Sequence, residues 1–240
     1  MSEHPVTKHA RRTYRIFRKG NTSFGKKIGE VFIEIMIIVF AVSLTLYLER
    51  WREDHHDRKL ERQFLIGLRE DMEADKKELK SDSTSYHTNL VAFEYFLINQ
   101  KYDRDSLNKY SWTLQNTTNL DPNASRFEAL KSSGKLYIIH DETLLRSIVN
   151  YYQEVLPTLI DYGTRPLSEF KRNKITAYFD ENYRRDAKGA VIYEDVLRQN
   201  SMQNYLRKCK AIIENEILLK YHNTIVACDE LIAIIDEHLD

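Results

Sequence analysis

The sequence predicts an all-α protein, in which an N-terminal transmembrane helix continues into a stalk that is followed by an extracytoplasmic helical bundle. The chain of 240 residues has only 7 Gly and 4 Pro, too few for the turns of an all-β fold. One segment is apolar over eighteen residues apart from a single acid, and elsewhere apolar residues recur at steps of three and four, the spacing of helices. These observations divide the chain into a basic cytoplasmic arm (1–30), a transmembrane helix (31–48), a helical stalk (49–80) and a helical bundle domain (81–240).

The composition excludes several classes of protein. A mean hydropathy of -0.54 excludes a protein with many membrane spans, and a hydrophobic share of 42% is too high for a disordered chain. Two cysteines cannot frame a disulfide-stapled mini-domain or a four-cysteine zinc site.

The arm is strongly basic. From Met1 to Glu30, eight basic residues face two acidic ones, a net charge of +6, so the remaining residues carry −6 in a chain whose total is zero. Such an asymmetry favours an anionic partner, either lipid or nucleic acid. Val6, Ala10, Tyr14 and Phe17 fall at helical spacing, as in a helix that lies on anionic lipid; the alternative is that the charges only set topology. We expect membrane lipid, and no nucleic acid, to contact the basic side chains Arg11, Arg12, Arg15, Arg18, Lys19, Lys26 and Lys27.

Val31–Leu48 is predicted to span a membrane. Eighteen helical residues rise roughly 27 Å, close to the hydrocarbon thickness of a bilayer. The alternative, a buried core helix, is disfavoured because such helices seldom run apolar on all faces for five turns. Tyr47 and Trp51 stand at the far end, where amphipathic rings favour the membrane–water boundary. Glu34 either extends toward the headgroups or makes a polar contact with a partner helix.

The flanks of this span predict its orientation. The side before it carries +6, whereas Glu49–Lys59 balances four acids against four bases, so the positive-inside bias keeps the N-terminus cytoplasmic. The apolar run is longer than the core of a cleaved signal peptide, and no small-x-small pattern follows Leu48. We therefore expect a single-pass protein of the bacterial inner membrane with a periplasmic C-terminal domain.

The predicted stalk carries one apolar stripe, formed by Leu60, Phe64, Leu68 and Met72 at intervals of four residues. A stripe that narrow requires either a partner helix or the rest of the domain to cover it. We expect it to contact a partner or a second copy. The capping-type residues of Ser81–Ser85 predict a break in the helix.

Start and stop signals divide the bundle domain. Asp121-Pro122 and Asp141 are predicted helix starts, and Gly134 a helix end in the left-handed conformation. Pro157 and Gly163 are expected to interrupt the next region. The last segment, Met202 to Leu239, contains neither Gly nor Pro and suits a bundle helix.

The two cysteines and the histidines offer little chemistry. On one helix, Cys209 and Cys228 would lie roughly 28 Å apart, far beyond disulfide reach, so we interpret them as small buried hydrophobes, with an intermolecular bridge as the alternative. His55 and His56 point about 100° apart on a helix and share a metal poorly, which favours a solvated face. No HExxH, nucleophile elbow, GxGxxG or P-loop occurs. No catalytic, cofactor-binding or metal-binding residue is predicted.

Several motifs together resemble a known family. Gly29-Glu30 precedes an apolar span that ends in Trp51, Leu68-x-Glu70-Asp71 follows on a charged helix, and Phe127-x-x-Leu130-Lys131-Ser132-Ser133-Gly134-x-Leu136 comes later. Over roughly residues 28–240 the chain resembles a family of uncharacterised bacterial single-pass membrane proteins, frequent in Bacteroidetes, with a helical extracytoplasmic region. In place of the Asn residues that this family commonly shows beside the tryptophan, the chain has Glu49, Arg50 and Arg52. The resemblance implies the architecture and no activity.

Lys131–Gly134 has two interpretations. Lys131 complements a helix dipole and Gly134 a reversed cap, which makes the segment a helix C-terminus. The alternative is a ligand- or partner-binding corner with exposed hydroxyls.

For function, the sequence favours a non-enzymatic single-pass membrane protein without cofactor, whose exported domain is an interaction module, a scaffold or an accessory subunit of a membrane complex. The first alternative is a ligand-sensing helical bundle, although an arm of about 30 residues leaves no room for an output domain. A lesser alternative is a membrane-bound hydrolase, for which no small-molecule substrate is indicated.

Overall fold

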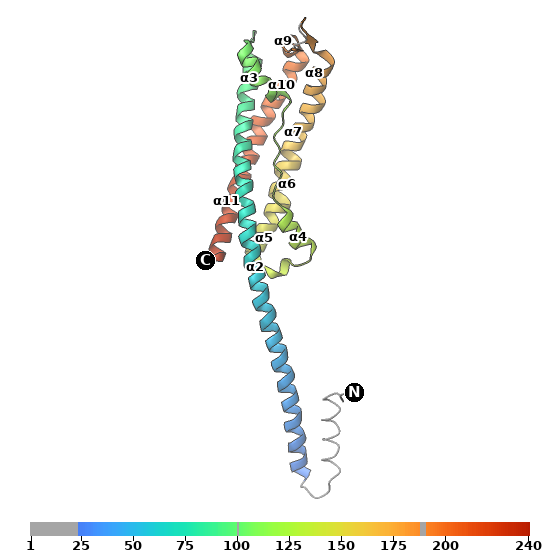
Figure 1. Ribbon diagram of the computed structural model, residues 1–240, viewed down its shortest axis with the longest axis vertical. Coiled ribbons are helices and arrows are strands. Elements are labelled where there is room, and N and C mark those ends of the chain that lie inside the picture. Colours follow the sequence, from blue (N-terminus) through green and yellow to red (C-terminus); the bar gives the residue numbers. More distant parts are fainter. Residues whose placement is uncertain (1–23, 100, 188–190) are drawn as a thin grey trace. The chain divides into compact units, whose positions relative to one another are not determined.

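The structure, a computed structural model, describes residues 24–99, 101–187 and 191–240 (Figure 1). Within these residues the regular structure is helical apart from two strands of two residues each, β1 (Arg184–Arg185) and β2 (Val191–Ile192), which pair antiparallel. The predicted all-α fold class is confirmed. The chain divides into two compact units, Met1–Lys59 and Leu60–Asp240, and helix α2 (Phe24–Ile98) contributes residues to both.

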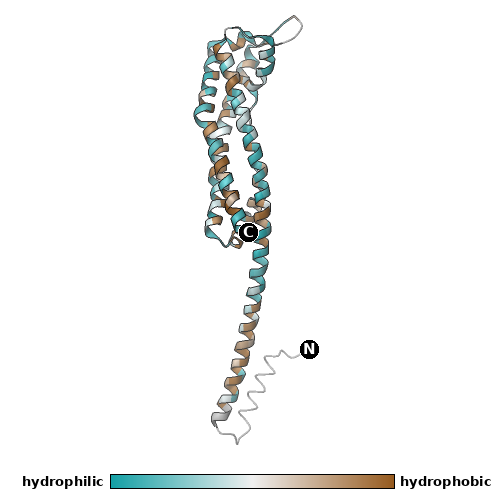
Figure 2. Ribbon diagram, turned by 90° about the vertical axis from the view of Figure 1, so that its left-hand side faces the viewer, coloured by the Kyte–Doolittle hydropathy of each residue, from teal (hydrophilic) through white to brown (hydrophobic). Residues whose placement is uncertain are grey.

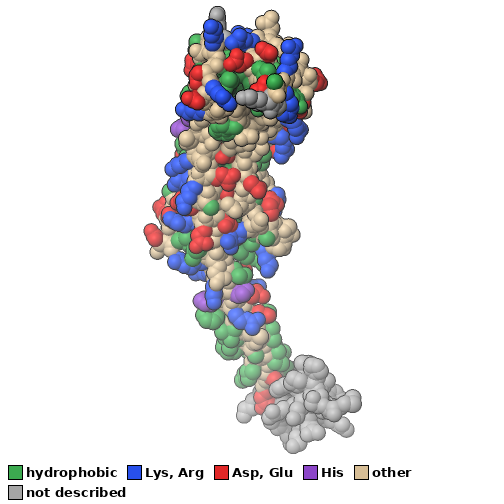
Figure 3. Space-filling view, turned by 45° about the horizontal axis from the view of Figure 1, so that its top comes forward, with side chains coloured by type: hydrophobic (Ala, Val, Ile, Leu, Met, Phe, Trp, Pro, Cys, Tyr) green, Lys and Arg blue, Asp and Glu red, His purple; other side chains and the backbone are tan. Residues whose placement is uncertain are grey.

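In the first unit, α2 carries the apolar segment. Among the described residues it is the one helix long and apolar enough to cross a membrane, and its most apolar window has a mean hydropathy of 2.5 with none of its residues buried. This exposure is opposite to that of a soluble core helix. Figure 2 shows the segment as a continuous hydrophobic stretch, and in Figure 3 hydrophobic side chains predominate on its surface.

The second unit is built on three long helical stretches. The first is α2 from Leu60 onward. The second joins α5 (Glu142–Asn150), η2 (Tyr151–Val155), α6 (Leu156–Leu159), η3 (Ile160–Thr164), α7 (Arg165–Phe170), η4 (Lys171–Thr176) and α8 (Ala177–Asn182). The third joins α10 (Asn200–Ile212), η5 (Ile213–Ile217) and α11 (Leu218–Leu239). The segments η2 to η5 are π-helical turns.

Side-chain contacts establish that α2 and α10–α11 run antiparallel. Arg69 pairs with Asp236, Asp82 accepts a hydrogen bond from Tyr221, and Gln203 donates to the backbone oxygen of Phe96, so later residues of α2 meet earlier ones of the third stretch. The second stretch also runs antiparallel to the third, because the hydroxyl of Tyr178 in α8 bonds Gln199 just before α10, whereas α6 contacts α11.

A long connection returns the chain from the end of α2 to the start of α5. It comprises α3 (Arg104–Gln115), an extended segment 116–124, α4 (Ser125–Ser132) and the 3₁₀ turn η1 (Leu136–Ile138). The extended segment lies along α2 in the opposite direction: the Tyr86 hydroxyl donates to the oxygen of Thr118, and Asp75 accepts from Asn123. At the other end of the unit, the short strands and α9 (Glu194–Leu197) connect α8 to α10.

Apart from Phe64 and Ala92, the buried side chains of α2 alternate at steps of four and three residues. One row is apolar, and in the other, whose six residues recur every seven positions, four side chains are polar. The apolar row comprises Leu65, Met72, Leu79, Tyr86 and Phe93; the other comprises Glu61, Leu68, Asp75, Asp82, Asn89 and Phe96. We call Glu61, Asp75, Asp82 and Asn89 the polar row.

Prolines within the second stretch follow π-helical turns. Pro157 is the second residue of α6, directly after η2, and Pro166 is the second residue of α7, directly after η3. Proline lacks an N–H and its ring crowds the carbonyl of the fourth residue before it, which in both cases lies in the preceding π turn. The wider turn provides the space, and the helix continues. The predicted interruption at Pro157 and Gly163 is therefore wrong.

Three further boundaries differ from the predictions. The second compact unit begins at Leu60, so only residues 49–59 of the predicted stalk lie outside it, and the bundle does not begin at residue 81. Ser81–Ser85 stays helical because Asp82 on this turn faces Tyr221 inside the bundle, while Thr84 and Ser85 donate to carbonyls four residues back. Asp121-Pro122 does not start a helix, since Asp75 holds Asn123 in the extended segment and α4 begins at Ser125.

Other predicted boundaries are confirmed. Asp141 caps α5, its carboxylate accepting from the N–H groups of Thr143 and Leu144, and these bonds lower the pKa of Asp141. Gly134 has a φ of 69° after the end of α4. The hydroxyls of Ser132 and Ser133 donate to carbonyls of their own helix, which supports the interpretation of Lys131–Gly134 as a helix end.

Candidate functional site

The residues predicted for membrane contact lie in the first unit or outside the described residues. Tyr47 and Trp51 are exposed, at 66% and 63%, and Glu34 is half-buried. The basic side chains Arg11, Arg12, Arg15, Arg18 and Lys19 lie outside the described residues; Lys26 and Lys27 fall within α2, but their side chains are not described.

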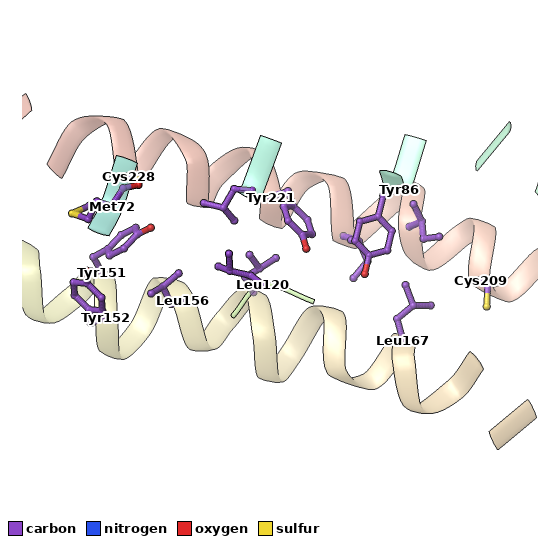
Figure 4. Packing of buried hydrophobic residues seen from close by; sticks show 14 of the residues in the cluster. Met72, Tyr86, Leu120, Tyr151, Tyr152, Leu156, Leu167, Cys209, Tyr221 and Cys228 are labelled. Carbon is purple, nitrogen blue, oxygen red and sulfur yellow. The ribbon is translucent and has the colours of Figure 1, made fainter. Parts of the chain in front are cut away.

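The predicted partner stripe belongs to the core of the second unit. Leu68 and Met72 are fully buried, Phe64 is 8% exposed, and Leu60 packs half-buried against the same core. Figure 4 shows Met72 beside Cys228 of α11 and Tyr151 of η2. The prediction of partner contact is therefore wrong for Phe64, Leu68 and Met72, because the chain itself covers them, and it stays a prediction for Leu60.

The polar row begins with Glu61, whose carboxylate is enclosed by two histidines. The backbone N–H of His140 donates to Oε1 (N···O 3.0 Å), and Nδ1 of the same residue lies 3.1 Å from Oε2. On the opposite helix, Nε2 of His238 lies 3.5 Å from Oε1. Glu61 thus joins α2 to the start of α5 and to the end of α11.

Asp75 is fully buried and fixes the return connection. Its carboxylate accepts from the backbone N–H of Asn123 (3.0 Å) and from Nδ2 of the same residue (2.6 Å). Burial raises the pKa of Asp75, and the two hydrogen bonds oppose that rise.

The hydroxyls of Tyr151 and Tyr152, both buried, have no hydrogen-bond partner among the described residues.

Asp82 and Asn89 complete the polar row. The hydroxyl of Tyr221 donates to Asp82 (O···O 3.1 Å), and the Tyr221 and Tyr86 rings lie 5.4 Å apart (Figure 4). Burial raises the pKa of Asp82 to about 6, against the effect of the Tyr221 hydrogen bond. Asn89 is 3% exposed, and its Oδ1 finds no partner in the part of the chain that the structure describes.

The polar row thus joins α2 to three different elements. A polar side chain at a core position is satisfied in only one register, so such residues specify one arrangement of helices at some expense in stability. We infer that the row fixes α2 lengthwise within the bundle.

Lys171 is a buried basic residue outside the polar row. It is 1% exposed, and its ammonium donates to the carbonyls of Thr113 (2.7 Å) and Asn116 at the end of α3. Burial lowers the pKa of Lys171 to about 8. A cation at a helix C-terminus satisfies carbonyls that the helix leaves unpaired, so this lysine has a structural role.

The cysteines are free and buried, as predicted, and no bond joins them. Burial raises the pKa of each thiol to about 11. Raised thiol pKa values disfavour the reactive thiolate.

An open groove runs along the surface where α5–η2–α6 packs against α11. It consists of two adjoining hollows of about 230 and about 120 Å³ that share Val155 and Ala227. Buried side chains, among them Tyr151, Leu159 and Leu231, form its floor. The remaining lining residues are Ser147, Asn150, Glu154, Thr158, Lys220, Asn223, Thr224, Glu230 and Ile234.

The described residues contain no group of three or more His, Cys, Asp or Glu side chains placed to hold a metal ion.

Protein-family models, curated proteins and solved structures yield no match to this chain.

Sequence reasoning missed both the polar row and the groove. For the polar row a signal was present: Asp75, Asp82 and Asn89 stand at intervals of seven among apolar residues at the alternating positions. For the groove no such signal exists, because its walls come from segments about 70 residues apart.

Proposed function

We propose that the chain is a non-enzymatic single-pass membrane protein whose helical bundle serves as an interaction module, a scaffold or an accessory subunit of a membrane complex. The observation that carries the proposal is the full exposure of the apolar segment in the first unit. Apolar side chains on every face of a helix have no stable place in water but suit a bilayer. A bundle on the same helix is thereby attached to the membrane.

The charge of the flanks supports the orientation. A net +6 before the span and a balanced segment after it favour a cytoplasmic N-terminus and a periplasmic bundle in a bacterial inner membrane, with the basic arm on anionic lipid. We also propose that the chain belongs to the Bacteroidetes-type family of single-pass membrane proteins, on the basis of the motifs around Trp51 and Gly134.

A topology experiment tests the membrane part of the proposal. Alkaline phosphatase fused after Asp240 should be active, since it works only after export, whereas a fluorescent protein that folds only in the cytoplasm should stay dark at the same position. Active cytoplasmic reporter at Asp240 would refute the orientation. Release of the full chain from membranes by carbonate at high pH would refute the span.

The interaction part of the proposal is that the chain associates with a protein partner or a second copy. It is supported by the open groove of the second unit. Affinity purification of the full chain from native membranes, with mass spectrometry of the co-purifying proteins, tests it. A stable complex supports the accessory subunit, and recovery of a strict monomer in both detergent extract and native membrane extract counts against any association.

A ligand-sensing bundle is the second candidate. Buried acids favour it, because Asp75 and Asp82 have raised pKa values on the helix that carries the apolar segment, and charge changes there alter bundle stability. Engineered cysteines on the helices of the bundle test this candidate by their rate of reaction with thiol reagents. Rates that stay the same across the physiological pH range would argue against sensing of protons.

A further inference from the structure

The groove between α5–η2–α6 and α11 is long enough to receive a helix of about four turns. Its lining runs from Lys220 to Ile234 on α11, about 21 Å at the helical rise of 1.5 Å per residue. Small side chains, Ser147 and Ala227, stand along it, and Leu159 and Leu231 contribute a buried apolar side chain to each hollow. Grooves of this kind receive the apolar face of an amphipathic helix.

Two of the three charged side chains along the groove are acidic. Glu154 stands on one wall and Glu230 on the other, both exposed, and neither has a hydrogen bond or ion pair with another described residue. The one base in the lining, Lys220, is engaged elsewhere: its ammonium lies 3.5 Å from Glu216, and its stem passes over Gly163, where a Cβ would stand 3.1 Å away. Two unpaired carboxylates therefore face whatever occupies the groove.

We propose that this groove docks an amphipathic helix of another protein, about four turns long, whose apolar stripe is flanked by Lys or Arg residues. The apolar stripe fills the floor, and the basic flanks pair with Glu154 and Glu230. The proposal rests on the proposed function, of which it names the partner chemistry.

A second copy of this chain fits the groove less well. The exposed apolar row beside the groove on α11 consists of Leu219, Val226 and Ala233. Acids flank that row, among them Glu216, Glu230 and Glu237. Docking it into a second groove would bring carboxylates against Glu154 and Glu230, and like charges in contact are unfavourable.

The experiment uses the full chain in nanodiscs of zwitterionic lipid and fluorescent synthetic helices of about 18 residues. The first probe has Leu and Ala at positions i, i+3, i+4 and i+7 with Lys on both flanks; the second is identical except that Glu replaces Lys. Fluorescence anisotropy measures binding, with empty nanodiscs as the background. The wild-type chain should bind the Lys probe at least about tenfold more tightly than the Glu probe.

Three variants of the chain test the location. The double change Glu154→Lys and Glu230→Lys should reverse the preference between the probes, a gain of binding that misfolding cannot mimic. Ala227→Phe, which fills the junction of the two hollows, should abolish binding of both. The matched control, Glu169→Lys with Glu181→Lys, reverses two exposed acids outside the groove and should leave the preference unchanged.

Equal affinity of the wild-type chain for the two probes would overturn the proposal, as would an unchanged preference in the charge-reversed variant. Self-association that Ala227→Phe abolishes would also overturn it, by making a second copy the occupant. These outcomes leave the topology reporter at Asp240 unaffected, so a failure of the docking site is distinguishable from a failure of the membrane assignment.

Discussion

Replacing Asp82 by Asn is expected to make the stability of the bundle less dependent on pH. Asp82 is 7% exposed, and the neighbours of its carboxyl are the Tyr221 hydroxyl, which donates to it, and Glu78, whose charge opposes its ionisation. Asn keeps the size of the side chain and an oxygen that accepts from Tyr221, and it removes the buried charge.

The magnitude follows from the pKa of Asp82, which burial raises from 3.8 to about 6 in the folded chain. Since the folded value lies above the unfolded one, the contribution of this group to stability is fully present below pH 3.8 and is lost as the pH rises through about 6. Between about pH 4 and about pH 7.5 the loss amounts to roughly 2 kcal/mol. The amide has no such dependence, and any penalty of about 1–3 kcal/mol for its unpaired N–H groups is the same at both pH values.

The assay is urea unfolding of the full chain in nonionic detergent, followed by far-ultraviolet circular dichroism at the two pH values. The free energy of unfolding of Asp82→Asn minus that of the wild type should rise by about 2 kcal/mol from the lower pH to the higher. Asp180→Asn, an exposed acid on α8, serves as the control and should show no such rise. A difference for Asp82→Asn that is the same at both pH values would refute the reasoning.

Three further substitutions can be measured by the same unfolding assay. A Cβ at Gly67 would stand 2.3 Å from the Arg126 guanidinium. Gly67→Ala should therefore be nearly neutral in the wild type, but in an Arg126→Ala background it should stabilise the chain by about 1 kcal/mol, the gain in helix propensity. Equal effects in both backgrounds would contradict this. Gly134→Ala meets no side chain but holds a φ of +69°, so a loss of about 1 kcal/mol is expected, and a gain in stability would show that the turn relaxes. Lys171→Met leaves the carbonyls at the end of α3 unpaired and should lower the free energy of unfolding by about 1–3 kcal/mol near neutral pH. Because burial lowers the pKa of Lys171 to about 8, the wild type should also gain stability relative to Lys171→Met as the pH rises above 8, and parallel pH curves would disprove that.

The sequence predicted local features well. Asp141 and Gly134 act on their own neighbours, so the residue type alone indicates the cap or the left-handed turn. The all-α class and the apolar segment also depend on composition and spacing within one helix. The burial of Cys209 and Cys228 followed from their places on the apolar stripe of one helix.

Long-range contacts explain the failures. The alternating core positions of α2 are interrupted in the sequence by Asp75, Asp82 and Asn89, which read as surface residues until their partners are known. Those partners, Asn123 for Asp75 and Tyr221 for Asp82, lie 48 and 139 residues away in the chain. The predicted break at Ser81–Ser85 arose from capping-type side chains, whereas in the fold Asp82 on this turn accepts a hydrogen bond from Tyr221.

The groove was unpredictable for the same reason. Ala227 and Val155 share a hollow only because α11 runs antiparallel to α5–α6, and Glu154 and Glu230 each resemble an ordinary surface acid in isolation. Local patterns identify which residues are exposed or buried, whereas the pairing of helices decides which exposed residues meet.

The π-helical turns give the three long stretches unequal tolerance to changes in length. A π turn holds one residue more than an α turn, so deleting one residue from η2 or η5 can convert that turn to α-helix while the residues on either side keep their partners. In α2, a deletion within Leu65–Phe93 rotates every following core position by about 100° and displaces the remaining polar row from its partners. Length variation in this fold should therefore accumulate in the second and third stretches, while the part of α2 from Leu65 to Phe93 keeps a fixed number of residues.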